Sequence, residues 1–473
     1  MNPELALYYL ASLNESRIKP GLERIDGVLK SLGHPHREYP HMLVAGTNGK
    51  GSVVAMTGAV LSASGLVTGR FTSPHLHGFA ERIVVGERPV TPDELTELVC
   101  DVRDTGVELT YFEFATAMAL LHFARRKVDV AILEVGLGGR WDATNVTDPF
   151  LSVITSVDLD HGKWLGSTVE EVAANKAPVM RAGRRVIVGP VVPEARDVIL
   201  RYADKAGSDV VLFGRDFNAR WEAGGEPGGR TLQFNGRKWS MGKVTPGLPG
   251  RFQLGNAACV LAAVESMDGS GWSLDMDDAV RGLGEARWPG RFQWVQGRPP
   301  VLVDGAHNPA AVRALVDSLE GIEPAVWLVS ALADKDLGGM AAWMGRLGRR
   351  VVLVPLDHPR AAGVREMAGQ FPEGFEVRSA ESVSHGLKMA REWAGESGTV
   401  IAAGSIVLAG KVLEELGKQE PEVEEGMCGD SSIDCFSGPA YDAGPGPVQD
   451  RRLGGFHANP CGRNRYRRGT GRG

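Results

Sequence analysis

Residues 41–65 read HMLVAGTNGKGSVVAMTGAVLSASG. The apolar run 41–46 has the length and composition of a buried strand, and residues 50–65 have those of a helix that ends at Gly65. In the glycine-rich turn between them, backbone N–H groups can approach phosphate oxygens, and the N-terminus of the following helix adds positive potential. This strand, turn and helix together predict a phosphate-binding loop.

The turn supplies most of the expected nucleotide contacts. Lys50 can reach β- and γ-phosphates as a point charge. The sequence departs from the common pattern G-x-x-x-x-G-K-[ST], because Val44 replaces the first glycine and Gly51 follows the lysine. A plain glycine-rich turn therefore remains an alternative when the stretch is taken alone. The candidate nucleotide-binding residues of the turn are Thr47, Asn48, Gly49, Lys50, Gly51 and Ser52.

The next 240 or so residues alternate between strand-length and helix-length segments, as in a doubly wound α/β domain. Continuous apolar runs at 128–136 and 151–157 are typical of parallel strands that are covered on both faces. The glycine-rich, polar stretch 214–245 predicts a β-hairpin insertion. Amphipathic patterns predict helices at 92–104, 111–126, 168–181 and 254–268.

A second, smaller series of strands and helices begins after Trp288-Pro289-Gly290. It predicts a second α/β domain over 287–417, following a first domain over 1–286. Its strands are expected at 301–306, 325–332, 351–356 and 399–405.

Residues 418–473 are rich in Gly, Pro, Ser and charge, a composition that cannot bury enough apolar surface to offset its ordering entropy. We therefore expect a disordered tail. Its arginine cluster, 463–468, could bind nucleic acid, but a solvated tail without that role is the favoured interpretation.

Composition narrows the class of protein. The chain has 473 residues with 43% hydrophobic and 23% charged, which is ordinary for globular domains. A net charge of −6 gives no reason to expect nucleic acid or an anionic membrane as partner. The few cysteines, the absence of a signal-like N-terminus and the lack of a membrane-length apolar run suit a soluble cytoplasmic enzyme. We also expect a monomer whose partners are small molecules.

Eight motifs follow one another along the chain with consistent spacing. In this order and spacing the chain resembles the folylpolyglutamate synthase/dihydrofolate synthase family, a branch of the Mur ligase superfamily, from about residue 20 to 416. The motifs are AGTNGKGS (45–52), FTSPHL (71–76), LTYFEFATA (109–117), LEVGLGGRWDATN (133–145), ITSVDLDH (154–161), NKAPV (175–179), PGRFQ (289–293) and DGAHNPA (304–310).

The resemblance implies a P-loop ATPase domain of Mur ligase type, with a folate-binding N-terminal segment, and a smaller Rossmann-like C-terminal domain. It also implies an ATP-dependent ligase that adds L-glutamate to dihydropteroate, to the γ-carboxylate of a folate, or to both. The carboxylate is activated as an acyl phosphate, and ADP and phosphate are released.

Two rival functions are weighed against it. Cell-wall ligases of the superfamily usually carry a UDP-sugar domain before the phosphate loop, whereas about 40 residues precede it here. A nucleotide-binding module without catalysis would have no need of the intact set Lys50, Ser73, Glu134, His161 and Asp304.

Glu134 ends an apolar strand, where open α/β sheets place their ligand chemistry. A carboxylate buried there is costly unless it is paired or bound to metal, although a nearby helix N-terminus could also satisfy it. The resemblance implies that Ser73, Glu134 and His161 bind magnesium, with two ions present. Histidine is an unusual ligand for so hard an ion, and Gly162 replaces the threonine that usually follows it.

Lys176 lies on a predicted helix, and the resemblance implies that CO₂ carbamylates it. Carbamylation requires a lowered lysine pKa and hence a neutral fraction. The alternative is a surface ion pair with Glu170 or Glu171. The family usually has E-K-A-G at this point, whereas this chain has N-K-A-P at 175–178, which puts the modification in question.

The remaining candidates surround the nucleotide and the organic substrate. We expect Asn256 at adenine, Arg291 at the nucleotide, Asp304 at a ribose hydroxyl and His307 at phosphate, so that ATP lies between domains and hinge closure assembles the site. Lys50, Lys176 and His307 are the expected catalytic residues. Tyr111 and Phe112 could stack on a pterin or could instead form a core turn. The substrate candidates are Glu23, Arg24, Ser73, Pro74, His75, Tyr111 and Phe112.

Overall fold

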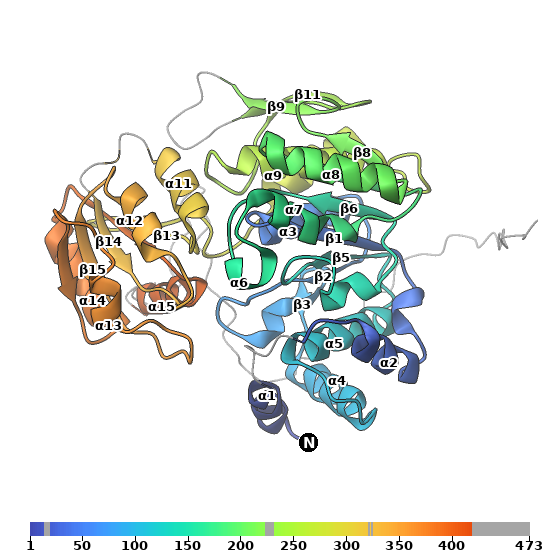
Figure 1. Ribbon diagram of the computed structural model, residues 1–473, viewed down its shortest axis with the longest axis horizontal. Coiled ribbons are helices and arrows are strands. Elements are labelled where there is room, and N and C mark those ends of the chain that lie inside the picture. Colours follow the sequence, from blue (N-terminus) through green and yellow to red (C-terminus); the bar gives the residue numbers. More distant parts are fainter. Residues whose placement is uncertain (14–18, 223–230, 320–321, 323–324, 419–473) are drawn as a thin grey trace, which may run out of the picture. The chain divides into compact units, whose positions relative to one another are not determined.

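The computed structural model describes residues 1–13, 19–222, 231–319, 322 and 325–418. Of the predicted tail, only Lys418 falls within these residues, so the expectation of disorder lies outside what the structure describes. Residues Met1–Pro421 form one compact unit, whose described residues contain two large sheets with helices on both faces and a smaller three-stranded sheet (Figure 1). Among the described residues, no helix is long and apolar enough to cross a membrane.

The larger sheet has eight strands in the order β4-β3-β2-β5-β1-β6-β7-β8. The six neighbouring strands β2, β5, β1, β6, β7 and β8 are parallel. The strands β3 and β4 extend the sheet beyond β2 through antiparallel pairing. The bounds are β1 His41–Ala45, β2 Thr68–Phe71, β3 Ile83–Val85, β4 Arg88–Pro89, β5 Val130–Glu134, β6 Leu151–Ile154, β7 Arg185–Val188 and β8 Asp209–Leu212. The strand β1 lies between β5 and β6, so the loop that follows it leaves the middle of the sheet.

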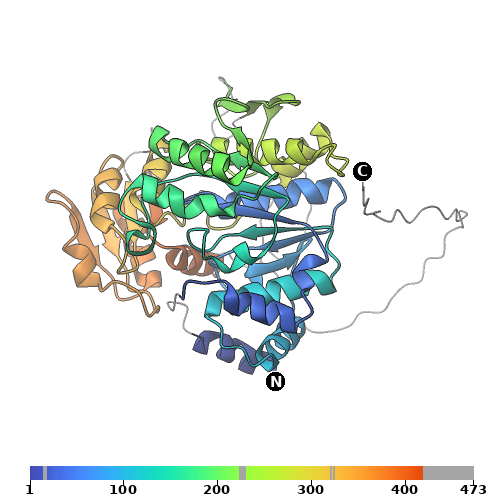
Figure 2. The same cartoon turned by 45° about the vertical axis from the view of Figure 1, so that its right-hand side comes forward.

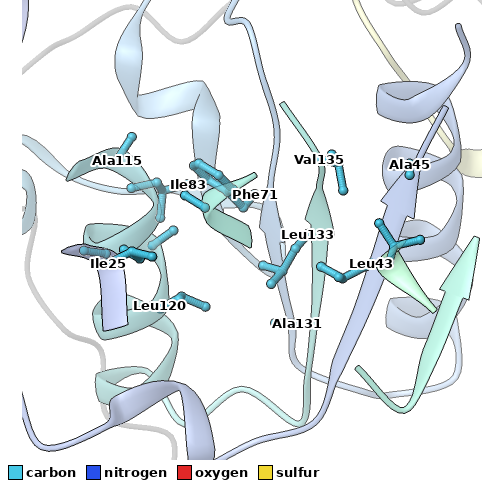
Figure 3. Close-up of a cluster of buried hydrophobic side chains, with 14 of the residues drawn as sticks. Ile25, Leu43, Ala45, Phe71, Ile83, Ala115, Leu120, Ala131, Leu133 and Val135 are labelled. Atoms are coloured by element: carbon cyan, nitrogen blue, oxygen red, sulfur yellow. The ribbon is translucent and has the colours of Figure 1, made fainter. Parts of the chain in front are cut away.

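Alternate side chains of the strands point to opposite faces of the sheet and contribute to two hydrophobic cores. Leu43, Ala45 and Leu133 face one core, and Figure 3 shows them with Phe71 and with Ile25 and Leu120 from two covering helices. The helices on this face are α1 Pro3–Ser12, α2 Glu23–Ser31, α4 Pro92–Asp104, α5 Tyr111–Arg125, α7 Val169–Lys176 and α8 Pro193–Ala206. Helix α1 packs against α4 at the end of this layer (Figure 2).

The opposite core contains Met42, Val44 and Ile132. Its helices are α3 Lys50–Ala63, α9 Gln253–Met267 and α10 Met276–Glu285. Continuous burial of β1, β5 and β6 confirms the prediction of strands covered on both faces.

Two local predictions need correction. The stretch 214–245 is not a single hairpin but a three-stranded antiparallel sheet of β9 Asn218–Trp221, β10 Leu232–Asn235 and β11 Ser240–Val244, in the order β11-β10-β9. Apolar residues from all three strands join the core that contains α9 and α10, with β9 and β10 against α9 and β11 against α10. The helix predicted at 168–181 ends at Lys176 and continues only as a 3₁₀ turn, Ala177–Val179, because Pro178 has no backbone N–H to donate.

The smaller sheet has six strands in the order β12-β13-β17-β14-β15-β16, and only β12 is antiparallel. Its strands are β12 Gln293–Val295, β13 Val301–Val303, β14 Ala325–Val329, β15 Arg350–Leu353, β16 Glu376–Ser379 and β17 Thr399–Ala403. Helices α11 Pro309–Asp317, α12 Leu337–Met344, α13 Val364–Ala368, α14 Val383–Ala394 and α15 Ile406–Gly417 enclose it. The predicted fold class is therefore confirmed, whereas the boundary near residue 286 stays a prediction.

Candidate active site

The phosphate loop leaves β1 at Ala45 and enters α3 at Lys50, as predicted. Gly46 and Gly49 have φ angles of 152° and 86°, which L side chains rarely adopt. A Cβ on Gly46 would collide with the Thr155 hydroxyl, and one on Gly49 would collide with the Asn256 side chain. These two positions therefore require glycine for both backbone conformation and space.

The segment after β6 holds this loop in place. The Thr155 hydroxyl donates to the Asn48 carbonyl at 2.6 Å, and the Asn48 amide donates to the Ser156 hydroxyl at 3.0 Å. The Thr47 hydroxyl donates to the Asp158 carbonyl and accepts its amide, each at 3.0 Å. The motif ITSVD thus acts as a support for the loop, a role that the sequence alone did not reveal.

Two lysines point at one carbonyl of the loop. Lys50 Nζ donates to the carbonyls of Gly46 and Thr47 at 3.1 and 3.2 Å, and Lys176 Nζ donates to the Gly46 carbonyl at 2.8 Å. Lys176 is 3% exposed, and burial, followed by the charge of Lys50, lowers its pKa to about 7. Two lysine amines therefore meet at one carbonyl of the loop that is predicted to bind phosphate.

The alternative of a surface ion pair for Lys176 is wrong. The side chain is buried, and Glu171 instead caps α7, where its carboxylate accepts the Ser167 amide at 2.7 Å. Asn175, where the family usually has glutamate, donates to the Leu165 carbonyl at 2.9 Å and so joins α7 to α6 Gly162–Leu165. Carbamylation of Lys176 stays a prediction.

Glu134 is the last residue of β5 and is 4% exposed. Its Oε2 accepts the Ser73 backbone amide at 3.0 Å, so a loop amide rather than a helix N-terminus is its partner. Burial raises the pKa of Glu134, while the charge of Lys50 and the Ser73 hydrogen bond oppose this rise. A buried carboxylate beside a phosphate-binding lysine fits a hard cation such as magnesium.

The described residues contain no group of three or more His, Cys, Asp or Glu that could hold a metal ion by itself. A site built on Glu134 and the Ser73 hydroxyl would therefore need phosphate and water oxygens, as magnesium sites in nucleotide enzymes usually do. His161 adopts a left-handed backbone with φ of 51°, and burial lowers its pKa to about 4, which leaves a neutral imidazole at neutral pH.

The 73–76 loop rests on two residues that the sequence analysis missed. Glu81 accepts the backbone amides of Leu76, His77 and Gly78, each at 2.8 Å. Arg82 donates to His75 Nδ1 at 2.8 Å, and its guanidinium lies 5.1 Å from the centre of the Tyr111 ring. Ser73 is half-buried, whereas Pro74 is exposed.

The aromatic candidates separate into different environments. Tyr111 is buried in the core, with its ring edge-on to Phe79 at 6.1 Å, which favours the core-turn alternative. Phe112 is half-buried between Phe71, 5.7 Å away, and Gly136, where a Cβ would overlap its ring. Stacking on a pterin stays a prediction for Phe112.

The two candidates on the N-terminal segment, Arg24 and Glu23, also have different environments. Arg24 forms an ion pair of 2.8 Å with Glu113, which caps α5, so the arginine is partly committed to the fold. Glu23 is exposed and lines an open pocket with Asp26, Asn145 and Arg181.

Asp304, beside the smaller sheet, was expected to contact a ribose, but its hydrogen bonds are with the backbone of nearby loops. Asp304 is buried, and its two oxygens accept the amides of Phe292 and Ala306 at 2.8 and 2.7 Å. Burial raises its pKa, opposed chiefly by Arg291. This geometry makes Asp304 a support for the loops that carry Arg291 and His307, and its contact with a ribose stays a prediction.

His307 and Asn256 each contact a residue of their own segment. His307 is half-buried, with Nδ1 2.9 Å from the Gly305 carbonyl. Asn256 is buried on α9 beside Gly49 and donates to Gln253 Oε1 at 2.8 Å. Asn256 lies on one of the helices that cover the larger sheet, within the range predicted for the first domain.

Asp160, Asn308 and Lys335 were not singled out from the sequence. Asp160 accepts Lys335 Nζ at 2.8 Å and Asn308 Nδ2 at 3.1 Å. Although burial opposes it, the His307 imidazole, whose Nε2 lies 3.7 Å from Oδ2, and the charge of Lys335 hold the Asp160 pKa well below its usual range. The acidic motif DLDH was the only local signal, because the partners lie 148 and 175 positions away.

The structure combines a doubly wound sheet that carries a phosphate loop with a second α/β sheet. Two family models match the corresponding stretches of the chain. The Mur ligase middle domain matches residues 44–264, and the Mur ligase, glutamate ligase domain, matches residues 290–406. Fold and site thus define a protein of the Mur ligase class.

Individual relatives make the assignment narrower. The dihydrofolate synthase/folylpolyglutamate synthase of Mycobacterium tuberculosis is 33% identical over 446 residues, covering 85% of this chain and 91% of that protein. A Halobacterium salinarum protein named "Probable bifunctional folylpolyglutamate synthase/dihydropteroate synthase" is 37% identical over 352 residues, which span 72% of this chain and 43% of that longer protein.

Solved structures agree. E. coli FolC in complex with DHPP and ADP superposes with a TM-score of 0.80 at 31% identity, covering 89% of this chain and 98% of that one. The bifunctional folylpolyglutamate synthase/dihydrofolate synthase of Yersinia pestis, complexed with AMPPNP and Mn ion, gives a TM-score of 0.78 at 32% identity, with coverages of 88% and 98%. The chain belongs to the dihydrofolate synthase/folylpolyglutamate synthase family.

Proposed function

We propose that this protein is an ATP-dependent ligase that joins L-glutamate to dihydropteroate and to the γ-carboxylate of a folate. The observation that carries the proposal is the convergence of Lys50 and Lys176 on the Gly46 carbonyl, within a phosphate loop at the carboxyl edge of the larger sheet. The relatives named for these two activities, and a related structure with DHPP and ADP, support the choice of substrates over a UDP-sugar peptide.

Nucleotide and metal would meet at the loop. Thr47, Asn48 and Gly49 to Ser52 would surround the phosphates, and Ser73, Glu134 and His161 would hold two magnesium ions. The Mn ion and AMPPNP in the Yersinia pestis structure support use of a divalent cation with the nucleotide. Bound there, the cations would neutralise phosphate charge.

The chain's own residues would act mainly by position and charge. Lys50 lies where it can stabilise the charge that develops when the substrate carboxylate attacks the γ-phosphate. His307 would contact phosphate from the smaller sheet. The product of this step is an acyl phosphate, whose carbonyl the glutamate amine attacks while phosphate leaves. Excluding water protects the acyl phosphate from hydrolysis.

Lys176 would serve as a carbamate. Its pKa of about 7 leaves a neutral amine that can take up CO₂ and present an anion in place of a cation. This change would also relieve the repulsion between Lys176 and Lys50, whose amines share one carbonyl partner.

We further propose a first domain over 1–286 and a second over 287–417, with the nucleotide between them. The protein would act as a monomer in the cytoplasm, with ATP, glutamate and a pteroate-type substrate as its small-molecule partners. Free Cys100 and Cys259 suit such a reducing compartment.

Oxygen transfer tests the reaction. Dihydropteroate labelled with ¹⁸O in its carboxylate is incubated with ATP, magnesium, glutamate and the protein. An acyl phosphate predicts that one labelled oxygen appears in the released phosphate and that the organic product gains one glutamate by mass. Unlabelled phosphate alongside the same product would contradict activation of the carboxylate by phosphorylation.

A further inference from the structure

Asp160 joins segments that come from both sheets. It lies in the loop that follows β6, where its Oδ1 accepts Lys335 Nζ at 2.8 Å and its Oδ2 accepts Asn308 Nδ2 at 3.1 Å. Asn308 follows β13 as the N-cap of α11, and Lys335 lies between β14 and α12. One carboxylate of the larger sheet thus binds the segments that follow two strands of the smaller one.

The contacts continue to the phosphate loop. The side-chain amides of Asn308 and Asn48 pair, with Asn308 Nδ2 3.1 Å from Asn48 Oδ1 and Asn48 Nδ2 3.4 Å from Asn308 Oδ1. Asn308 is 2% exposed and Asn48 is half-buried, so this pairing is partly shielded from water. Lys335, Asp160, Asn308 and Asn48, called here the Asp160 network, form a continuous path from the smaller sheet to the loop.

The burial of these groups indicates what the network is for. The side chains of Lys335 and Asp160 are 6% and 10% exposed. A buried ion pair is a poor source of stability, because desolvation offsets most of the attraction between the charges. Hydrogen bonds from an amide and an ammonium do, however, fix the distance and direction of the groups that they join. The network therefore suits positioning better than general stabilisation.

We propose that Asp160 is a positioning residue for the ligase reaction, because with Lys335 and Asn308 it holds the smaller sheet's carboxyl edge at the phosphate loop. This inference rests on the proposed function. Asp304 and His307 lie on the loop that leads into Asn308, so the network sets where these side chains meet the nucleotide. Because most of the expected phosphate contacts come from the loop, we expect the network to affect ADP affinity less than the rate of phosphoryl transfer, which requires groups from both sheets to be aligned.

Three variants break the network at different points. Asp160→Asn removes the charge, Lys335→Met removes the ammonium, and Asn308→Ser removes the bridging amide while keeping an oxygen that can cap the Ala311 amide. We expect kcat to fall about tenfold to 100-fold in each, while the ADP dissociation constant, measured by calorimetry, changes less than about threefold. Asp209→Asn, which breaks an exposed ion pair with Arg185 inside the larger sheet, is the matched control and should keep its kcat.

A double variant separates positioning from stability. Asp160→Leu combined with Lys335→Met replaces the ion pair by apolar side chains, a change that often restores stability. We expect the thermal midpoint to recover and kcat to stay low. Recovery of kcat together with the midpoint would overturn the proposal in favour of a merely structural pair.

The magnesium dependence of the variants provides a second control, because the expected metal ligand His161 has its Nε2 3.5 Å from Lys335 Nζ. If the magnesium concentration needed for half-maximal rate rises in parallel with the loss of kcat, the network acts through His161 and the positioning role is refuted. A wild-type chain that releases no ADP with either folate substrate contradicts the proposed function, and the positioning role falls with it. An active wild type whose three variants all match Asp209→Asn contradicts the positioning role alone.

Discussion

Replacement of Lys176 by methionine should make the protein more stable and inactive. Lys176 is 3% exposed, and burial, followed by the nearby charge of Lys50, lowers its pKa to about 7. In the unfolded chain a lysine has a pKa of about 10.4. Between these two values the unfolded chain binds more protons than the folded one, so the free energy of unfolding rises with pH. Below pH 7 both states are protonated, and the full cost of the buried charge is present.

The size of the effect follows from the two pKa values. A difference of about 3.4 pH units at about 1.4 kcal/mol each sets an upper bound of about 5 kcal/mol. Methionine has a similar length and no charge. Lys176→Met should therefore exceed the wild type in free energy of unfolding by up to about 5 kcal/mol below pH 7, and this advantage should shrink as the pH rises toward about 10.

Urea unfolding in CO₂-free buffer at about pH 6 and about pH 9 measures this difference. Lys205→Met, which replaces an exposed lysine on α8, reports what the loss of a surface charge alone does. A Lys176→Met protein that is less stable than the wild type at the acidic pH would refute the argument from burial.

The turnover of Lys176 variants tests whether this lysine acts as a carbamate. At pH 7 about half of Lys176 is neutral, against about one in 2,500 for an ordinary lysine, so CO₂ has an amine to react with. Lys176→Ala should lose most activity, and Lys176→Glu, which keeps a negative charge, should retain more. An alanine variant as active as the wild type would eliminate the carbamate role.

Three further predictions follow from the sequence and the described contacts. Lys50→Ala should lose at least about 100-fold in turnover while keeping its circular dichroism spectrum, since Lys50 is the cation of the phosphate loop; near-normal turnover would remove the loop from the mechanism. Burial lowers the pKa of His36 to about 4 and that of His41 to about 3. The free energy of unfolding should therefore fall as pH drops below about 6.5, by up to about 1.4 kcal/mol per pH unit for each histidine. In His41→Phe this fall of the unfolding free energy with pH should be smaller, and an unchanged fall would contradict the prediction. Truncation after Lys418 should leave activity and thermal midpoint nearly unchanged, because the composition of 419–473 offers little apolar surface; a large drop in either would show that this segment packs on the body.

Local patterns predicted the parts of the site that lie on one segment. The strand before Gly46, the helix from Lys50 and the position of Glu134 at a strand end all follow from apolar periodicity, which spans only a few residues. The depressed pKa of Lys176 is also consistent with its predicted chemistry. Its burial did not follow from the sequence, where a lysine near two glutamates resembles a surface ion pair.

Contacts between distant segments could not be predicted in this way. Asp160 and Lys335 are 175 positions apart, and nothing near either residue shows that they meet. Asp304 was expected to face the nucleotide, yet its oxygens accept backbone amides, which every residue carries and no sequence motif marks. Tyr111 could be a stacking ring or a core ring, and its burial and the packing of Phe79 against it distinguish the two.

A substrate panel shows whether the chain adds glutamate to a pteroate-type carboxylate. ADP release is measured with ATP, magnesium and one of three substrates, dihydropteroate, tetrahydrofolate or a UDP-sugar peptide, each with and without glutamate. We predict glutamate-dependent release with dihydropteroate, tetrahydrofolate or both, and none with the UDP-sugar peptide. Release with the UDP-sugar peptide alone, or no glutamate-dependent release with any of the three, would contradict it.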